Sequence, residues 1–203
     1  MDKPCAAAAA RNAAPILGVL RHELRECSTL FEIGSGTGQH AVTVAAALPD
    51  LEWQTSDLEQ SHAGIRAWIE DAGLENVLAP MDFDVLTVEP SGKKYDAVFS
   101  ANTAHIMSYV AVCRMFALVG AMLREPGVFC LYGPFSRGGA FSSPSNEAFD
   151  ASLRARNEAM GIRDLDDLGV LAGENGMQIA RVYSMPANNL LAVWTRTPPN
   201  CRR

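Results

Sequence analysis

Three glycines within the seven residues from Glu32 to Gly38 form the clearest chemical signal in the sequence. The stretch reads Glu-Ile-Gly-Ser-Gly-Thr-Gly and lies between a short apolar run and a segment of helical character. Glycine permits a tight turn and lets the backbone approach a ligand without a side-chain clash. A dinucleotide fingerprint, G-x-G-x-x-G/A, needs glycine or alanine at position 39, where the sequence has Gln39. The spacing G-x-G-x-G therefore indicates a different ligand loop, although a glycine-rich turn without a ligand shows the same letters.

Acidic residues follow this loop at the spacing that a bound nucleoside requires. Asp57 lies nineteen residues after Gly38, where the second strand is predicted to end. An acid about twenty residues after such a loop is placed to accept hydrogen bonds from ribose hydroxyls. Asp57 is therefore the predicted ribose ligand, with Glu59 as the reserve. Asp82 and Asp84 follow the third predicted strand, and either carboxylate could meet an adenine edge.

Polar residues after the fourth and fifth predicted strands form a candidate reaction centre. His105 titrates near neutral pH and is the candidate general base, unless its ring caps the following helix or bonds to the backbone. Asn102 and Tyr132 could orient a substrate, although a tyrosine at a strand end is as often a packed ring. Arg11 could pair with a ligand carboxylate through a bidentate contact, or be a solvated arginine at the start of a helix.

The predicted elements bring these residues to one edge of a parallel sheet. Strands are predicted at 30–33, 52–55, 77–81, 97–100, 128–132, 178–184 and 190–195. Helices are predicted at 15–25, with Pro15 in the first turn, and at 39–48, 61–72, 109–123, 146–160 and 165–174. Strands that alternate with helices predict an α/β fold with a parallel sheet covered on both faces. The loop 185–189 predicts a hairpin at the edge of that sheet.

Several segments along the chain resemble a methyltransferase-like family of uncharacterised function. These segments are Ala10-Arg11-Asn12, Glu32 to His40, Ser56-Asp57, Phe83-Asp84-Val85, Asn102 to Ile106, Tyr132 to Phe135, Ser145 to Asp150, Gly161 to Asp164 and Met185 to Asn189. The glycine loop, with an acid two residues before its first glycine, also resembles the first motif of class I S-adenosylmethionine-dependent methyltransferases. The resemblance implies a Rossmann-like class I methyltransferase fold, with a seven-stranded, mostly parallel sheet whose last strand is antiparallel. It also places the acid of the third strand at Asp84 rather than Asp82.

The resemblance implies S-adenosyl-L-methionine as cofactor and in-line methyl transfer, without metal, to an unidentified small-molecule or protein acceptor. The candidate cofactor-binding residues are Arg11, for the methionyl carboxylate, Glu32, Gly34, Ser35, Gly36, Gly38, Asp57, Asp84 and Asn102. The candidate catalytic residues are His105, Asn102 and Tyr132. Acceptor selection is expected late in the chain, from the 135–150 loop as a lid, Arg163 and Asn188-Asn189. Binding motifs do not prove turnover, so a non-catalytic S-adenosylmethionine-binding partner module remains an alternative, and a nicotinamide-dependent oxidoreductase a weaker one.

Composition bounds these expectations. The 203 residues predict a single domain over 1–203, with 1–9 as a flexible segment and 197–203 as a tail. A net charge of −6 disfavours nucleic acid and anionic membranes as partners. The four histidines and five cysteines are dispersed without metal-ligand spacing, so no metal site and no disulfide framework are predicted. The absence of a long apolar segment in the sequence predicts a cytoplasmic protein.

Overall fold

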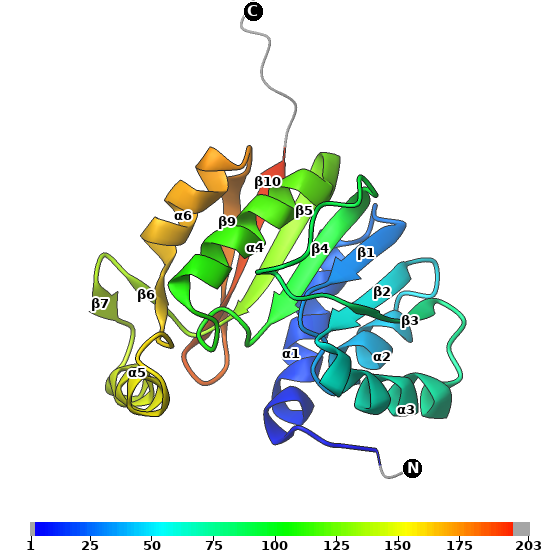
Figure 1. Ribbon diagram of the computed structural model, residues 1–203, viewed down its shortest axis with the longest axis horizontal. Coiled ribbons are helices and arrows are strands. Elements are labelled where there is room, and N and C mark those ends of the chain that lie inside the picture. Colours follow the sequence, from blue (N-terminus) through cyan, green and yellow to red (C-terminus); the bar gives the residue numbers. More distant parts are fainter. Residues whose placement is uncertain (1–2, 197–203) are drawn as a thin grey trace, which may run out of the picture.

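The computed structural model describes residues 3–196 and shows a twisted central sheet between two groups of helices (Figure 1). The sheet has seven strands in the order β3-β2-β1-β4-β5-β10-β9. The strands are β1 (Thr29–Glu32), β2 (Glu52–Asp57), β3 (Val77–Asp82), β4 (Tyr95–Ala101), β5 (Leu123–Gly133), β9 (Gln178–Met185) and β10 (Asn189–Arg196). The first five pair in parallel, whereas β10 is antiparallel to both β5 and β9. The predicted α/β fold, with a C-terminal antiparallel hairpin, is therefore confirmed.

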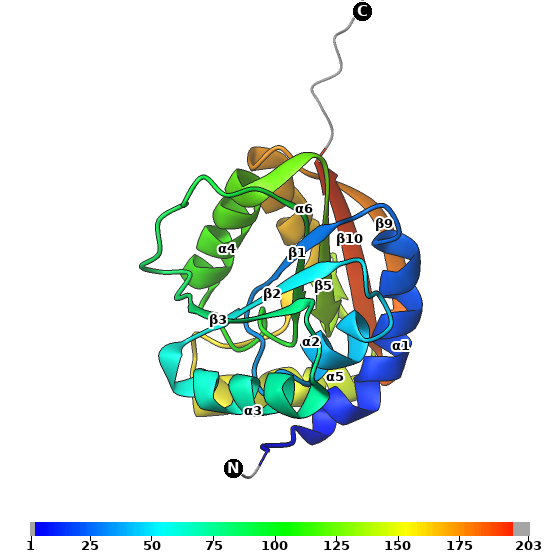
Figure 2. The same ribbon diagram turned by 90° about the vertical axis from the view of Figure 1, so that its right-hand side faces the viewer.

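Helices cover both faces of this sheet. On one face lie α1 (Ala7–Glu23), α2 (Gln39–Ala45) and α3 (His62–Ala72), and on the other lie α4 (Tyr109–Met122) and α6 (Leu165–Glu174) (Figure 2). Local capping sets several helix starts: Ser108 begins α4 and Ser143 begins α5 (Pro144–Arg156), each by accepting a hydrogen bond from a free backbone N–H. Among the helices of residues 3–196, none combines the length and the apolar character needed to cross a membrane.

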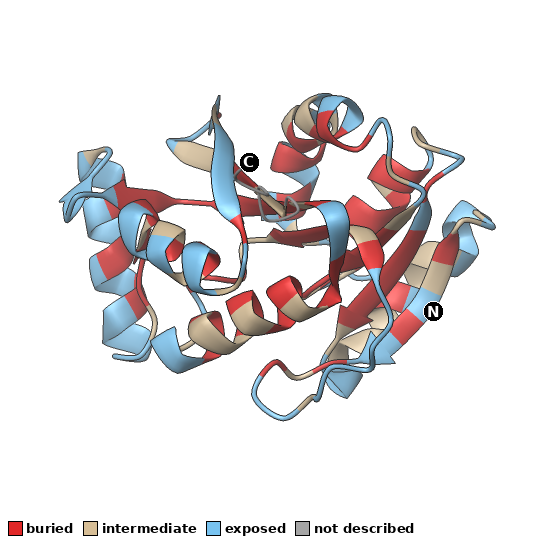
Figure 3. Ribbon diagram, turned by 90° about the horizontal axis from the view of Figure 1, so that it is seen from above, coloured by how far each residue is buried: buried red, intermediate tan, exposed pale blue. Residues whose placement is uncertain are grey.

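Apolar side chains are buried on both faces of the sheet. Phe31 and Val98 point toward α4, whereas Leu30 and Phe99 point toward α1 and α2. Figure 3 shows the buried positions running through the strands and along the inner faces of the helices. A strand buried on both sides cannot shift its register without exposing apolar surface, so the ends of β1 to β5 are held in fixed positions.

The first helix starts earlier than predicted. The sequence pattern placed its start at Pro15, but the helix begins at Ala7 and Pro15 lies in its interior. Alanine has the highest helix propensity, so the run from Ala6 to Ala10 continues the helix toward the N-terminus. Burial of Ala9 and Ala13 against the rest of the domain adds tertiary stabilisation. The proline costs the helix one hydrogen bond, to the carbonyl of Arg11, without ending it.

The segment expected to be flexible has defined contacts over residues 3–9. The backbone N–H of Ala6 donates to Gln39 Oε1 at 2.6 Å, and Trp68 Nε1 donates to the carbonyl of Pro4 at 2.6 Å. The ammonium of Lys3 lies 3.9 Å from the centre of the Trp68 ring. These contacts hold the start of the chain across α2 and α3. The expected tail at 197–203 lies outside the described residues.

The 135–150 region, expected as a lid loop, contains secondary structure. It supplies β6 (Phe135–Arg137), β7 (Ala140–Phe141) and the first turns of α5, and β8 (Arg163–Asp164) completes a small sheet in the order β7-β6-β8. The carboxylate of Asp164 accepts hydrogen bonds from Gly139 N at 2.7 Å and Ser136 Oγ at 3.1 Å while also capping α6. One aspartate thus fastens the turn of this region to α6, a long-range contact that local sequence does not show.

Candidate functional site

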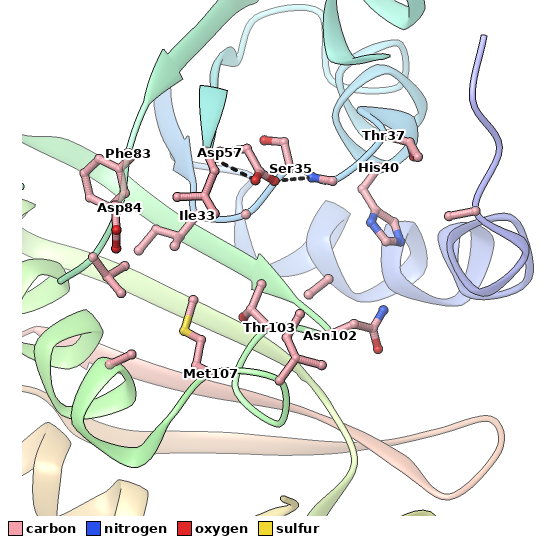
Figure 4. Close-up of a pocket in the computed structure, with 18 of the residues that line it drawn as sticks. Ile33, Ser35, Thr37, His40, Asp57, Phe83, Asp84, Asn102, Thr103 and Met107 are labelled. Carbon is pink, nitrogen blue, oxygen red and sulfur yellow. Dashed lines mark hydrogen bonds between the residues drawn. The ribbon is translucent and has the colours of Figure 1, made fainter. Parts of the chain in front are cut away.

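A cavity of about 580 Å³ opens at the carboxyl ends of β1 to β4 (Figure 4). Its lining comprises Ala6, Ala8, Ala9, Ile33, Gly34, Ser35, Gly36, Thr37, His40, Asp57, Leu58, Phe83, Asp84, Val85, Leu86, Ala101, Asn102, Thr103, Ile106, Met107, Ser108 and Ala111. Asp57 and Asp84 are the charged side chains among them. In an open α/β sheet, this edge is where ligands bind.

The glycine loop needs glycine for its backbone and for space. Gly34 has φ of +73°, and a Cβ there would lie 2.6 Å from Thr103 Cγ2. Gly38 has φ of +90°, and a Cβ there would lie 3.2 Å from Ile65 Cα. Gly36 has φ of +59°, and a Cβ there would meet no atom within 4 Å, so it leaves open space beside the cavity. The loop therefore lies close to its neighbours at both ends and is open at its centre.

Glu32 supports this loop from behind. Its side chain is buried, and Oε2 accepts hydrogen bonds from Ser35 Oγ at 2.8 Å and from Trp53 Nε1 at 2.9 Å. Burial raises the pKa of Glu32 to about 7, against the effect of these two hydrogen bonds. Ser35 and Ser56 also exchange hydrogen bonds, which ties the loop to β2. Glu32, predicted as a cofactor ligand, thus positions Ser35 and does not line the cavity.

Asp57 lies at the end of β2 and faces the cavity. Its Oδ2 accepts a 2.7 Å hydrogen bond from the backbone N–H of Gly36, and its Oδ1 accepts one from Leu58 N at 2.8 Å. A carboxylate has about four lone-pair sites, so acceptor capacity remains for a ligand. The reserve candidate, Glu59, is not part of the lining.

Asp84, rather than Asp82, lines the cavity after the third strand. Its Oδ1 accepts a hydrogen bond from Leu86 N at 2.9 Å, which fixes the carboxylate in a tight turn. Phe83 and Val85 flank it with apolar surface that also lines the cavity. Asp82 is exposed and lies outside the lining. This end of the cavity therefore offers an acceptor between apolar side chains, a suitable environment for a heteroaromatic ring.

Asn102 marks the opposite end of the cavity, after β4. Its φ is +61°, a conformation that non-glycine residues seldom adopt, and its backbone N–H donates to the carbonyl of Tyr132 at 2.9 Å. Figure 4 shows Asn102 and His40 on one side of the view, with Phe83 and Asp84 on the other. Such strained residues concentrate at functional sites.

The other two catalytic candidates lie outside the cavity lining. His105 is buried with its ring centre 5.4 Å from that of Phe149. Burial, assisted by the charges of Arg156 and Arg163, lowers the pKa of His105 to about 4. Tyr132 is buried in the core facing α1, and this burial raises the pKa of its hydroxyl against the effect of the Asn12 and Asn189 side chains.

The residues predicted to hold the methionyl carboxylate or the acceptor lie outside the cavity lining. Arg11 is exposed and absent from the lining. The buried guanidinium of Arg163 donates to the backbone carbonyls of Ala104 at 3.0 Å, Ala159 at 2.8 Å and Met107. Asn188 accepts a hydrogen bond from Asn146 through its carbonyl, which joins the hairpin to α5. Arg163 and Asn188 therefore hold segments around the site in place.

His40 is a cavity residue that sequence reasoning missed. It lies in the first turn of α2, and its Nε2 is 2.7 Å from Asn12 Oδ1. Burial lowers its pKa to about 4. In the sequence, His40 lies at the end of a segment that resembles the family and is one of four scattered histidines, and it was predicted to have no role in the site. Its position two residues after the last loop glycine was the available signal, because the helix that follows such a loop starts at the ligand edge.

The sheet order and the helices on its two faces form the class I methyltransferase fold. An O-methyltransferase family protein from Burkholderia thailandensis has this fold, with a TM-score of 0.82, 14% identity and coverage of 95% of this chain and 58% of that one. Mitomycin 7-O-methyltransferase MmcR has a TM-score of 0.80 with 15% identity, covering 92% and 54%. PigF, solved with SAH, has a TM-score of 0.77 with 16% identity, covering 92% and 56%.

The chain belongs to the family described as protein of unknown function (DUF938), whose model it matches over residues 3–196. The chain spans little more than half the length of the three solved proteins.

Proposed function

We propose that this protein is an S-adenosylmethionine-dependent methyltransferase that acts on a small-molecule or protein acceptor. The observation that carries the proposal is the Asp57 carboxylate, which is bonded to Gly36 N at 2.7 Å and faces the cavity. This contact brings an acceptor for ribose hydroxyls directly beside the glycine loop. The G-x-G-x-G spacing and the class I methyltransferase fold agree with this ligand.

The lining fits the parts of the proposed cofactor. Asp57 would hold the ribose, Asp84 the exocyclic amine of adenine, and Phe83 and Val85 the faces of its ring. The lack of a Cβ at Gly34 lets Thr103 pack against the loop, and the open space beside Gly36 lets a ligand approach it. Asn102 lies at the far end, where the amino-acid part would extend.

When bound, S-adenosylmethionine supplies a sulfonium-activated methyl group that a nucleophile can take by in-line displacement. The protein's contribution is to position the nucleophile and to exclude water, and neither task requires a metal. Ile106 and Met107 line the cavity next to Asn102 and supply apolar surface for exclusion. The side-chain amide of Asn102 would orient the acceptor. Because the solved relatives named above include O-methyltransferases, an oxygen nucleophile is the first to test.

A non-catalytic S-adenosylmethionine-binding module is the second candidate. One observation favours it: of the three predicted catalytic residues, His105 and Tyr132 are outside the lining, and Asn102 alone of these is inside it. A nicotinamide oxidoreductase is disfavoured, because buried Gln39 occupies the position where its fingerprint needs glycine or alanine. Gln39 instead accepts a hydrogen bond from Ala6 N.

Calorimetry with S-adenosylmethionine, S-adenosylhomocysteine and NAD in parallel tests the proposal. We expect both adenosyl ligands to bind and NAD not to bind; binding of NAD alone would refute the proposal. Mass spectrometry of hydroxylated metabolite and peptide pools, incubated with protein and methyl-labelled cofactor, then separates the two candidates. A methylated product supports the enzyme, whereas cofactor binding without any product supports the module.

A further inference from the structure

Four polar side chains from different elements lie together next to the cavity. His40 of α2 is hydrogen-bonded to Asn12 of α1, and the side chains of Asn12 and of Asn189 in β10 act on the Tyr132 hydroxyl of β5 to lower its pKa against the effect of burial. His40, Asn12 and Tyr132 are all buried, with exposed fractions of 7%, 9% and 2%. Of these four residues, His40 is the one that lines the cavity.

The hydrogen bond to Asn12 determines which ring nitrogen of His40 carries the hydrogen. Asn12 Oδ1 lies 2.7 Å from His40 Nε2, and an amide oxygen can only accept, so Nε2 donates. The amide nitrogen of Asn12 is then left for the Tyr132 hydroxyl. Burial lowers the pKa of His40 to about 4, so the ring is neutral at neutral pH. Nδ1 therefore has a free lone pair and no hydrogen.

This lone pair is not used by the described part of the protein. The enclosed side-chain nitrogens and oxygens of residues 3–196 all have hydrogen-bond partners, apart from Trp194 Nε1. Nδ1 of His40 has no partner within the same residues, so it is not enclosed. Since His40 lines the cavity, Nδ1 is available as a hydrogen-bond acceptor for a ligand that occupies it.

The position of His40 selects the part of the ligand that it meets. Phe99 of β4 lies next to it, with ring centres 6.2 Å apart, so His40 belongs to the β4 end of the cavity with Asn102. Asp57 and Asp84, which would hold adenosine, follow β2 and β3 at the other end. An adenosyl ligand anchored there extends its amino-acid part toward His40.

Resting on the proposed function, we propose that His40 Nδ1 accepts a hydrogen bond from the α-ammonium group of the cofactor's amino-acid part. An ammonium has three donors and no acceptor, so it complements a bare imidazole nitrogen. A carboxylate would be repelled by the same lone pair. Asn12 and Tyr132 act as positioning residues, because they hold the ring in the tautomer that accepts.

Two probes that share the adenosine thioether test this assignment by calorimetry. S-adenosylhomocysteine carries the ammonium, whereas methylthioadenosine lacks the whole amino-acid part. We expect His40→Ala to lower the affinity for S-adenosylhomocysteine about tenfold or more, because a hydrogen bond to a charged group contributes on that scale. The same variant should change methylthioadenosine binding by no more than about twofold. His22→Ala, a histidine exposed at the opposite edge of the sheet, is the matched control and should bind both probes like wild type.

A second variant separates the ammonium contact from loss of structure. Asn12→Asp offers a carboxylate to His40 Nε2, which favours the imidazolium and places a hydrogen and a positive charge at Nδ1. We expect this variant to lose S-adenosylhomocysteine affinity selectively while keeping methylthioadenosine. Equal affinity of wild type and His40→Ala for S-adenosylhomocysteine, or an equal loss for both probes, would overturn the inference and leave the proposed function standing. Failure of wild type to bind either probe would overturn both.

Discussion

The backbone N–H of Gly36 donates a 2.7 Å hydrogen bond to the carboxylate of Asp57, across twenty-one positions of sequence. Ser35 and Ser56, the residues immediately before them, exchange hydrogen bonds as well. The ends of β1 and β2 are therefore joined at two successive residues. This joint gives the glycine loop a fixed distance from the acid proposed to hold ribose.

Replacing Asp57 should remove the ribose contact. We expect Asp57→Ala to weaken the binding of S-adenosylhomocysteine by on the order of 1–3 kcal/mol, because the ribose hydroxyls lose a charged acceptor. Isothermal titration calorimetry measures the change, after circular dichroism has shown that the variant is folded. Glu59→Ala is the control, since Glu59 lies outside the lining and its loss should leave affinity unchanged. Unaltered affinity in folded Asp57→Ala would remove Asp57 from the site.

Gly34→Ala should destabilise the protein more than an alanine at another left-handed glycine. Its φ of +73° is unfavourable for alanine, and its new Cβ would lie 2.6 Å from Thr103 Cγ2. Left-handed strain and overpacking together predict a loss of roughly 2–5 kcal/mol in the free energy of unfolding. Urea denaturation measures this loss.

Gly73→Ala provides the comparison for that loss. Gly73 ends α3 with φ of +61° and has no atom within 4 Å of the new Cβ. The free energy of unfolding of Gly73→Ala should therefore fall only by the roughly 1–2 kcal/mol that left-handed backbone strain costs. Equal losses for the two variants would show that the contact between Gly34 and Thr103 carries no stability.

Arg163→Gln should act on the wall of the cavity without contacting a ligand. The variant leaves buried carbonyls of the Ala104 to Met107 segment without their donor, at a cost of about 1–3 kcal/mol of stability. Ile106 and Met107 line the cavity, so cofactor affinity should fall together with stability. Thermal unfolding and calorimetry measure the two effects. Arg156→Gln, at an exposed position, should change neither, and an unchanged melting temperature for Arg163→Gln would contradict its structural role.

The free energy of unfolding should depend on pH through two buried histidines. The pKa values of His40 and His105 are lowered from 6.5 to about 4, so between these values the unfolded chain takes up protons that the folded chain does not. Their contribution is therefore present above pH 6.5 and is lost as the pH falls toward 4. Glu32 has the opposite sign, because its pKa is raised to about 7 and its contribution is lost as the pH rises through that value.

A comparison of His105→Phe with wild type isolates the contribution of His105 to the pH dependence of the free energy of unfolding. Between pH 7 and pH 5, wild type should lose about 2 kcal/mol more stability than the variant, because one histidine no longer titrates. Urea denaturation at the two pH values measures the difference, and the phenylalanine keeps an aromatic ring beside Phe149. Parallel pH profiles for the two proteins would show that His105 titrates normally in the folded state.

Sequence alone determined the fold class and the first half of the site. Apolar runs and helical spacing specify the strands from Thr29 to Gly133, because burial on both sheet faces needs such runs. The glycine spacing and Asp57 were legible because a tight turn and a strand end impose local requirements on residue type. The choice of Asp84 over Asp82 came from family resemblance, and the structure places Asp84 in the lining.

Only the tertiary structure decided which polar side chains reach the cavity. His105 follows β4 as expected, yet its ring lies against Phe149 of α5, forty-four residues later in the sequence. Asn12 holds His40 in the lining. Ala6, Ala8 and Ala9 reach the lining through the packing of α1, whose start lies before the position that the local sequence pattern predicted. Such contacts join residues far apart in the chain, and their geometry depends on how helices settle against the sheet. Local propensity carries no information about that packing, because it acts over a few residues and the side-chain orientations are set by burial and by hydrogen bonds across elements.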